Sequence, residues 1–265
     1  MKTFVIAECC SSWRFGPIEQ HLQNAYRMIL AAKECGADAA KFQFCSDPVE
    51  MSKRRNDNNP ANYEILVYPV EWLHKLKAKC DEVGIEFMCT VFLEKDIFRV
   101  APLVSRFKVA SAESSDQSFA DAHLEYKKPI IVSYAFGVMP HEGLNIKPLH
   151  CVCSYPTPIE QFNLARIKPE NGEEFSGISD HTTSVLTGAL AVACGASVLE
   201  KHCRLWDTPK DNPDFGHSLV VEPASDEFSF AKYVSNIREA EKAMGSGENV
   251  IQECEKININ RRVKV

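Results

Sequence analysis

The stretch that decides the fold is GISDHTTSVLTGALAVACGASVLEKHC, residues 177–203. Two short runs of small and apolar residues, each leading to a histidine (His181 and His202), flank residues 183–196, whose pattern predicts one helix. A strand, a helix and a second strand in this order form a βαβ unit, which places the two strands parallel. The stretch therefore predicts an α/β fold in which two neighbouring strands end on imidazoles.

The same alternation runs through the chain from residue 3. The predicted strands are 3–8, 39–44, 85–90, 106–111, 129–134, 146–153, 175–180 and 197–202. The clearest predicted helices are 18–35, 70–83, 184–194 and 225–244. Eight such repeats predict a TIM-type (β/α)8 barrel. A doubly wound open sheet is the alternative, but the chain lacks a Gly-rich turn after the first strand.

One repeat of this predicted barrel is incomplete. Only residues 135–145, AFGVMPHEGLN, join the fifth strand to the sixth, and they contain two glycines and a proline. Such a segment is too short for an ordinary helical crossover, so the helix after the fifth strand is predicted to be lost or shortened. We expect residues 1–245 to form a single barrel domain and residues 246–265 to form a C-terminal tail.

Composition excludes several classes of partner. The net charge of −6 does not favour binding to nucleic acid or to anionic membranes, and no apolar run is long enough to span a membrane. Eleven cysteines without a C-x-x-C pair, in a chain with no secretory signal, predict free thiols in the cytoplasm. The sequence does not fix the oligomeric state, and a homo-oligomer stays open.

Polar side chains gather at the carboxyl ends of the predicted strands, which is where a TIM barrel carries its active site. Residues two apart share one face of a strand, so Lys41 lies beside Gln43 and Glu200 beside His202. The polar residues at these strand ends are Glu8, Lys41, Gln43, Thr90, Lys108, Ser111, Glu113, Ser133, Ser179, Asp180, His181, Glu200, Lys201 and His202. One shared site explains this distribution.

Two lysines in a barrel mouth need negative charge nearby, because burying an unpaired ammonium group is costly. Lys41 and Lys108 therefore predict a ligand that carries a phosphate, a carboxylate or both. The alternative is that Lys41 pairs with Glu8 and Lys108 with Glu113 as structural ion pairs.

The histidines at the ends of the last two strands predict a metal site. Neighbouring strands lie about 4.8 Å apart, so His181 and His202 can converge on one ion. With carboxylate or water ligands beside them, such a site suits Mn²⁺, Fe²⁺, Co²⁺ or Zn²⁺ better than Ca²⁺. The alternative is that each is a hydrogen-bonded histidine of the core.

Taken in order, the motifs of this chain resemble those of the sialic acid synthase family, which includes the N-acetylneuraminate, legionaminate and pseudaminate synthases. The matching stretches are KFQ, GIEFMCTVF, KVASAE, KPIIVS, LHCVCSYPTPIEQFNL, GISDHT, GALAVACGASVLEKH and the PD and SLVVEP motifs after it. They cover residues 3–245. The resemblance implies an enzyme, a transferase that condenses phosphoenolpyruvate with an N-acetylated hexosamine such as N-acetylmannosamine. The products would be a nine-carbon 2-keto-3-deoxy sugar acid and phosphate.

The resemblance also implies roles for single residues. The residues that would surround phosphoenolpyruvate are Lys41, Gln43, Thr90, Lys108, Ser111, Ser133, Asn163 and Ser179. His181 and His202 would hold the metal, commonly Mn²⁺, with Mg²⁺, Co²⁺ or Zn²⁺ as alternatives. Glu113, Tyr155 and Asp214 would face the sugar. Glu8 and Glu113 are the candidates for proton transfer, and the sequence does not divide acid from base between them.

Four features depart from the family pattern. The E-A-G-x-N-H-x-G motif after the first strand is ECCSSWRFG here, SYAFG replaces S-T-G-M, and PDFGHS replaces P-D-H-K-x-S. The chain stops about where the family continues into a small antifreeze-like domain, so we expect that domain to be absent. The changes affect the sugar side or the outer ring, which leaves the acceptor open.

Two alternative functions remain. One is another phosphoenolpyruvate-dependent synthase, of the 3-deoxy-octulosonate or 3-deoxy-heptulosonate phosphate type. The other is a non-catalytic barrel that binds a sugar or an anion.

Overall fold

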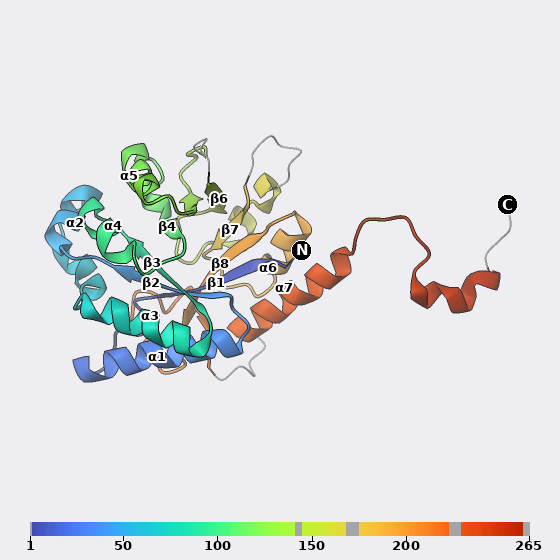
Figure 1. The fold of residues 1–265 in the computed structure, drawn as a ribbon, viewed down its shortest axis with the longest axis horizontal. Coiled ribbons are helices and arrows are strands. Elements are labelled where there is room, and N and C mark those ends of the chain that lie inside the picture. The colour runs from blue at the N-terminus through green and yellow to red at the C-terminus, as the bar shows by residue number, and fades with distance from the viewer. Residues whose placement is uncertain (1, 141–144, 168–174, 223–228, 262–265) are drawn as a thin grey trace.

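Eight parallel strands form a closed barrel in the computed structural model, which describes residues 2–140, 145–167, 175–222 and 229–261 (Figure 1). The strands are β1 Phe4–Cys10, β2 Ala39–Phe44, β3 Glu86–Val91, β4 Phe107–Val109, β5 Ile130–Tyr134, β6 Ile146–Cys151, β7 Gly177–Asp180 and β8 Val198–Arg204. They follow one another in chain order, and β8 pairs with β1 to close the ring. This closure confirms the (β/α)8 barrel over the open sheet.

Helices surround the barrel on the outside. They are α1 Ile18–Glu34, α2 Pro48–Arg55, α3 Glu71–Val83, α4 Glu94–Val100, α5 Gln117–Ala122, α6 Thr187–Ala193 and α7 Phe230–Met244. Four match the helices that the sequence predicts, although α6 begins only at Thr187, and residues 225–228 of the last prediction lie outside the described residues. The short helices α2, α4 and α5 were not predicted. Asp47 and Asp116 cap α2 and α5 by accepting backbone hydrogen bonds, a local signal that sequence patterns carry.

The fifth repeat has no α-helix in the part that the structure describes, residues 135–140 and 145. The prediction agrees with these residues, while 141–144 lie outside the described ones. The sixth repeat also departs from the ideal, because its described connection contains only the 3₁₀ turns Ile159–Gln161 and Leu164–Ile167. Among the described residues, the outer ring of helices is therefore incomplete after β5 and after β6.

The inner face of the barrel changes from apolar to polar along the strands. Alternation places residues i and i+2 on this face, one nearer the floor and the next nearer the mouth. The pairs are Ile6 and Glu8, Ala39 and Lys41, Met88 and Thr90, Ile131 and Ser133, and Val198 and Glu200. The first member of each pair belongs to one buried cluster that fills the floor. The second members form a polar layer at the carboxyl ends.

Close packing at the floor explains one glycine. A side chain at Gly177, at the start of β7, would place its Cβ 1.7 Å from the carbonyl oxygen of Val198 on β8. Only glycine allows these backbones to approach in this way. The approach sets the register of the two strands that lead to His181 and His202.

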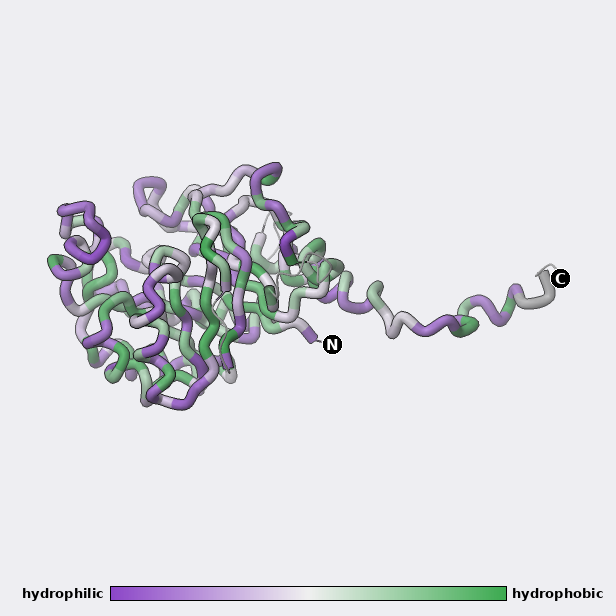
Figure 2. The backbone as a smooth tube through the Cα atoms, turned by 90° about the horizontal axis from the view of Figure 1, so that it is seen from above, coloured by the Kyte–Doolittle hydropathy of each residue, from purple (hydrophilic) through white to green (hydrophobic). Residues whose placement is uncertain are grey.

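Beyond α7 the chain leaves the barrel and reaches the 3₁₀ segment Glu253–Arg261 (Figures 1 and 2). Residues 243–258 are exposed. The division into a domain at 1–245 and a tail stays a prediction. Within the described residues, no helix has the length and the apolar character needed to cross a membrane.

Candidate active site

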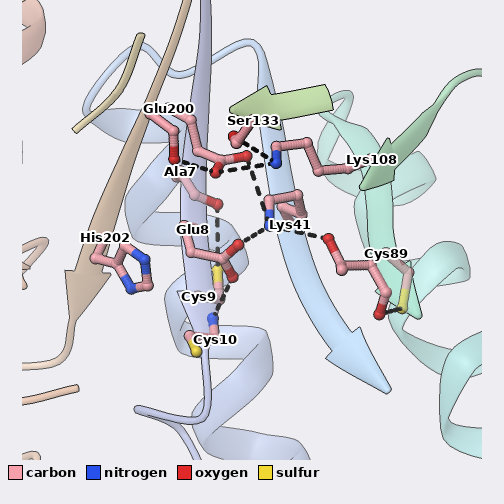
Figure 3. A network of polar contacts seen from close by, with 12 residues as sticks. Ala7, Glu8, Cys9, Cys10, Lys41, Cys89, Lys108, Ser133, Glu200 and His202 are labelled. Atoms are coloured by element: carbon pink, nitrogen blue, oxygen red, sulfur yellow. Dashed lines mark hydrogen bonds and ion pairs between the residues drawn. The ribbon is translucent and has the colours of Figure 1, made fainter. Parts of the chain in front are cut away.

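Lys41 lies in the barrel mouth among oxygen atoms from three other strands. Its ammonium group contacts the carboxylate of Glu8 and donates to Oγ1 of Thr90 at 3.1 Å. The Nζ atom also lies 3.5 Å from Oε2 of Glu200 (Figure 3). Burial lowers the pKa of Lys41 to about 8, against the opposing charge of Glu200. The expected ion pair between Lys41 and Glu8 is therefore present.

Lys108 faces the same space from β4. Its ammonium group donates to Oγ of Ser133 and to the carbonyl of Val109, both at 2.7 Å, and lies 3.7 Å from Oε1 of Glu200. Burial on its own would raise the pKa of Glu200, but Lys108 and Lys41 lower it to about 2. Glu200 thus serves as a shared counter-ion for both lysines, and Ser179 donates to it at 2.9 Å.

Glu113, the alternative partner of Lys108, pairs with another residue. Its Oε1 lies 2.7 Å from Nη2 of Arg55, on α2. Burial raises the pKa of Glu113 despite the opposing charges of Arg55, Arg54 and Lys108. The protonated form of Glu113 is therefore favoured relative to an exposed glutamate.

His181 and His202 lie next to each other at the mouth. Their ring centroids are 5.2 Å apart, a separation that allows both rings to reach one ion. Nδ1 of His181 lies 2.8 Å from the carbonyl oxygen of Val152, so this nitrogen carries the hydrogen and Nε2 is left with a lone pair. Burial lowers the pKa of His181 well below its usual value and that of His202 to about 4. Both rings are therefore neutral near pH 7, the form that binds metals.

A second group of ligand atoms surrounds His202. Cys10, His202 and Asp214 are buried, and one ligand atom from each lies within 4.8 Å of the other two. Burial on its own would raise the pKa of Asp214, but hydrogen bonds from His202 and His217 hold it well below its usual range. Sulfur, nitrogen and oxygen donors in this arrangement fit a divalent transition metal. His181 is not part of this group, so its predicted role as a metal ligand stays a prediction.

A cavity of about 400 Å³ opens over these groups. Five residues that the sequence predicts for the site line it: Gln43, Ser111, Tyr155, His202 and Asp214. Tyr155 is half exposed, and its ring lies 4.1 Å from the ring of His181, centroid to centroid. Two of the predicted sugar-side residues, Tyr155 and Asp214, thus line the same cavity as His202.

Most of the predicted site residues meet in this region, with one exception. The charged network contains Glu8, Lys41, Thr90, Lys108, Ser133 and Ser179. Asn163 is exposed on the loop after β6 and does not line the cavity, so the structure does not bring it together with the others.

The structure places four further residues here to which the sequence assigned no catalytic or ligand role. Glu200 was predicted only as one of the polar residues at the strand ends, on the same face as His202. Cys10, Arg55 and His217 line the cavity. Cys10 and His217 stand in ECC and PDFGHS, motifs that depart from the family pattern, whereas no sequence pattern indicated Arg55. Nε2 of His217 lies 3.3 Å from Nδ1 of His202.

Asp180, at the end of β7, and Lys201, within β8, face away from the mouth. They form an ion pair of 3.0 Å with no exposed surface, and the Lys201 ammonium lies 5.3 Å from the centre of the Tyr233 ring on α7. Each lies one position along its strand from residues whose side chains point into the barrel, so both side chains point outward, to the interface between the barrel and the helices. The pair joins β7 to β8 directly behind His181 and His202.

A closed (β/α)8 barrel whose carboxyl-terminal mouth gathers lysines, carboxylates and imidazoles has the architecture of a barrel enzyme. The model of the NeuB family matches residues 28–249, and the chain belongs to this family. This confirms the resemblance that the sequence motifs indicate.

Among its relatives is an uncharacterized protein of Methanocaldococcus jannaschii, 34% identical over 94% of this chain and 74% of the relative. The N,N'-diacetyllegionaminic acid synthase of Legionella pneumophila is 33% identical over 86% of this chain and 70% of its own. The chain is thus an enzyme of the synthase class, as the sequence predicts. Its fold resembles the N-acetylneuraminic acid (sialic acid) synthetase of Leptospira borgpetersenii solved with citrate, at a TM-score of 0.82 and 24% identity, over 99% of this chain and 92% of that one.

Proposed function

We propose that this chain condenses phosphoenolpyruvate with an N-acetylated hexosamine, such as N-acetylmannosamine, and releases phosphate and a nine-carbon 2-keto-3-deoxy sugar acid. The observation that carries the proposal is the pair of buried lysines, Lys41 and Lys108, which face one space beside His202 in the barrel mouth. A cytoplasmic location, which the eleven free thiols favour, belongs to the same proposal.

Phosphoenolpyruvate carries a phosphate and a carboxylate, and Lys41 and Lys108 balance their charge. Hydroxyl groups of Thr90, Ser133 and Ser179 already hydrogen-bond within this network, so they can orient the anion without a change of backbone. The anion displaces Glu200 as the partner of the two ammonium groups. The polar layer of the barrel is therefore the proposed binding site for phosphoenolpyruvate.

The reaction needs a new carbon–carbon bond and the loss of phosphate. The electron pair of the C2–C3 double bond of phosphoenolpyruvate forms a bond to the aldehyde carbon of the open-chain sugar, and the aldehyde oxygen gains a proton. Water adds at C2, and cleavage of the bond between C2 and the phosphate oxygen leaves a keto group. Phosphate carries away the electron pair of that bond.

Glu113 is the proposed donor of the proton to the aldehyde oxygen. Burial raises its pKa, and its Oε2 is buried without a hydrogen-bond partner among the described residues. Glu8 keeps its contact with Lys41 and is the proposed group that receives the proton of the attacking water. Arg55 holds Glu113 in place from α2.

The metal site is the third part of the proposal. His202 and its neighbours would hold the ion, which on the family resemblance is Mn²⁺, with Mg²⁺, Co²⁺ or Zn²⁺ as alternatives. When bound, such an ion supplies Lewis-acid polarisation of the acceptor carbonyl. Tyr155 and Asp214 line the cavity where the sugar would lie.

The acceptor is tested directly with a panel. The protein is incubated with phosphoenolpyruvate, Mn²⁺ and single sugars, and phosphate release is measured together with the mass of the product. We expect release with N-acetylhexosamines and a product whose mass equals the sum of acceptor and pyruvate. Release only with a phosphorylated tetrose or pentose would instead indicate the 3-deoxy-ulosonate phosphate type. No release with any acceptor, and no binding of phosphoenolpyruvate, would contradict the proposal.

A further inference from the structure

Cys10 ends β1 in a conformation that carries its side chain to the barrel mouth. Its φ angle is 41°, in the left-handed region that residues other than glycine rarely adopt. The pairing with β2 shifts between Glu8 and Cys10, and the backbone N–H of Cys10 donates to Oε1 of Glu8 at 2.7 Å. Backbone outliers of this kind cluster at functional sites. Here the outlier places a sulfur atom in the wall of the cavity.

The sulfur lies among ligand atoms that are already held in place. Asp214 accepts hydrogen bonds from the backbone N–H of Ser11 at 2.9 Å and from the Ser11 hydroxyl. Its other oxygen lies 3.6 Å from Nδ1 of His202 and 3.4 Å from Nε2 of His217. The ligand atoms of Cys10, His202 and Asp214 all lie within 4.8 Å of one another. A divalent ion with ordinary bonds to sulfur, nitrogen and oxygen needs donors at such separations.

The chemistry of these groups suits a cation between them. A buried carboxylate, a buried imidazole and a buried sulfur face one another, each with a ligand atom within 4.8 Å of the other two. A divalent ion stabilises a carboxylate beside it and deprotonates a thiol that coordinates it.

We propose that the Cys10 sulfur binds the metal of this site directly, together with His202 and Asp214. The inference rests on the metal site of the proposed function and goes beyond it, because it assigns a thiolate ligand at the position where the chain reads ECC in place of E-A-G. On binding, the thiol loses its proton to solvent, and the sulfur contributes an electron pair to the ion. No oxidation takes place.

A thiolate ligand changes which metals the site prefers. Soft sulfur donors favour Zn²⁺ and Co²⁺, whereas Mn²⁺ prefers oxygen ligands. The site therefore binds Zn²⁺ and Co²⁺ more tightly than a site of imidazole and carboxylate alone would. Mn²⁺ gains little from the sulfur.

The experiment uses Co²⁺ as a spectroscopic probe of the whole protein. A sulfur–cobalt bond gives an intense near-ultraviolet charge-transfer band, separate from the weaker visible bands of any bound Co²⁺. We expect the near-ultraviolet band in the unchanged protein and its loss in Cys10→Ser and Cys10→Ala. Cys153 lines the same cavity but lies outside the ligand group, so Cys153→Ser is the matched control and should keep the band. Circular dichroism checks that each variant is folded.

Affinities give a second, independent readout. Cys10→Ser should weaken the binding of Zn²⁺ by about tenfold or more and that of Mn²⁺ by about twofold or less. Two results would overturn the proposal that Cys10 is a ligand and leave the metal site itself in place. One is Co²⁺ that binds with visible bands but without the near-ultraviolet band. The other is a near-ultraviolet band that persists in both Cys10 variants. Absence of any Co²⁺ binding would overturn the metal site and the sulfur ligand together. Phosphate release, measured separately, tests the condensation itself.

Discussion

The carboxylate of Glu200 lies 3.5 Å from the ammonium group of Lys41, inside the barrel and away from water. The same carboxylate lies 3.7 Å from Lys108, so one side chain on β8 balances cations from β2 and β4. This internal counter-ion lowers the free-energy cost of keeping the two lysines buried before the substrate binds. The same group then competes with an anionic substrate for both lysines.

Replacement of Glu200 by glutamine separates these two effects. Glu200→Gln should lower the free energy of unfolding by about 3 kcal/mol, because removing one partner of a buried ion pair leaves the others uncompensated. It should also tighten the binding of phosphoenolpyruvate severalfold. Urea denaturation and calorimetry measure the two effects, with Glu125→Gln on the surface as the control. Unchanged stability and unchanged affinity would show that Glu200 is not the counter-ion.

The pH dependence of phosphoenolpyruvate binding follows from Lys41. Burial lowers its pKa to about 8, so the ammonium group loses its charge above that pH. The ion pair with Glu8 and the charges of Glu200 and Cys89 oppose this shift, and the positive charge of Lys108 adds to it. Affinity for phosphoenolpyruvate should fall as the pH rises through 8. Calorimetry on either side of pH 8 measures this, and Lys41→Arg, which stays charged, should show a flatter profile. An affinity that does not change across pH 8 in the unchanged protein would contradict the assignment.

The sign for stability is the opposite. Because the pKa of Lys41 is lower in the folded protein than its ordinary value of 10.5, the unfolded chain binds more protons between pH 8 and 10.5. The contribution of Lys41 to the free energy of unfolding therefore rises with pH across this window.

Replacing His202 or His181 should affect metal binding more than replacing a surface histidine does. His202→Ala should abolish metal-dependent turnover, because His202 belongs to the ligand group and lies beside His181. His181→Ala should weaken metal binding if the predicted pair shares one ion. Equilibrium dialysis and metal titration of phosphate release measure both, with exposed His74→Ala as the control. Metal activation that is unchanged in His202→Ala would count against the site.

The ion pair behind the histidines should contribute to stability. Asp180→Asn leaves Lys201 buried without its partner, so the free energy of unfolding should fall by about 3 kcal/mol. The double variant Asp180→Asn/Lys201→Met removes the uncompensated charge and should recover a large part of the loss. Chemical denaturation measures all three proteins. A double variant that is less stable than Asp180→Asn would argue against this explanation.

The local sequence pattern was sufficient to predict the barrel and the polar layer at its mouth. The two-residue alternation that pairs Lys41 with Gln43 and Glu200 with His202 is a property of every strand, so it predicts which side chains point inward. The same rule explains why Asp180 and Lys201, one position away, face α7. The helix bounds were less predictable where the helices are short, as for α2.

Contacts across long sequence separations were not predictable. Arg55 reaches Glu113 because α2 lies beside the turn after β4, and no motif joins residues 58 positions apart. Cys10 enters the cavity through a register shift in β1, which depends on the pairing with β2. Asn163 was assigned from family motifs alone, and its exposed place on the loop after β6 was not visible in the sequence.

The most direct test of the central claim is the affinity for phosphoenolpyruvate when the two buried cations are removed. Isothermal titration calorimetry compares the unchanged protein with Lys41→Met, Lys108→Met and the surface control Lys75→Met, each checked for folding. The account predicts a loss of affinity of about a hundredfold or more in each of the two buried variants, as expected for charge-assisted contacts, and none in the control. Binding that is equally tight in all four proteins would contradict it.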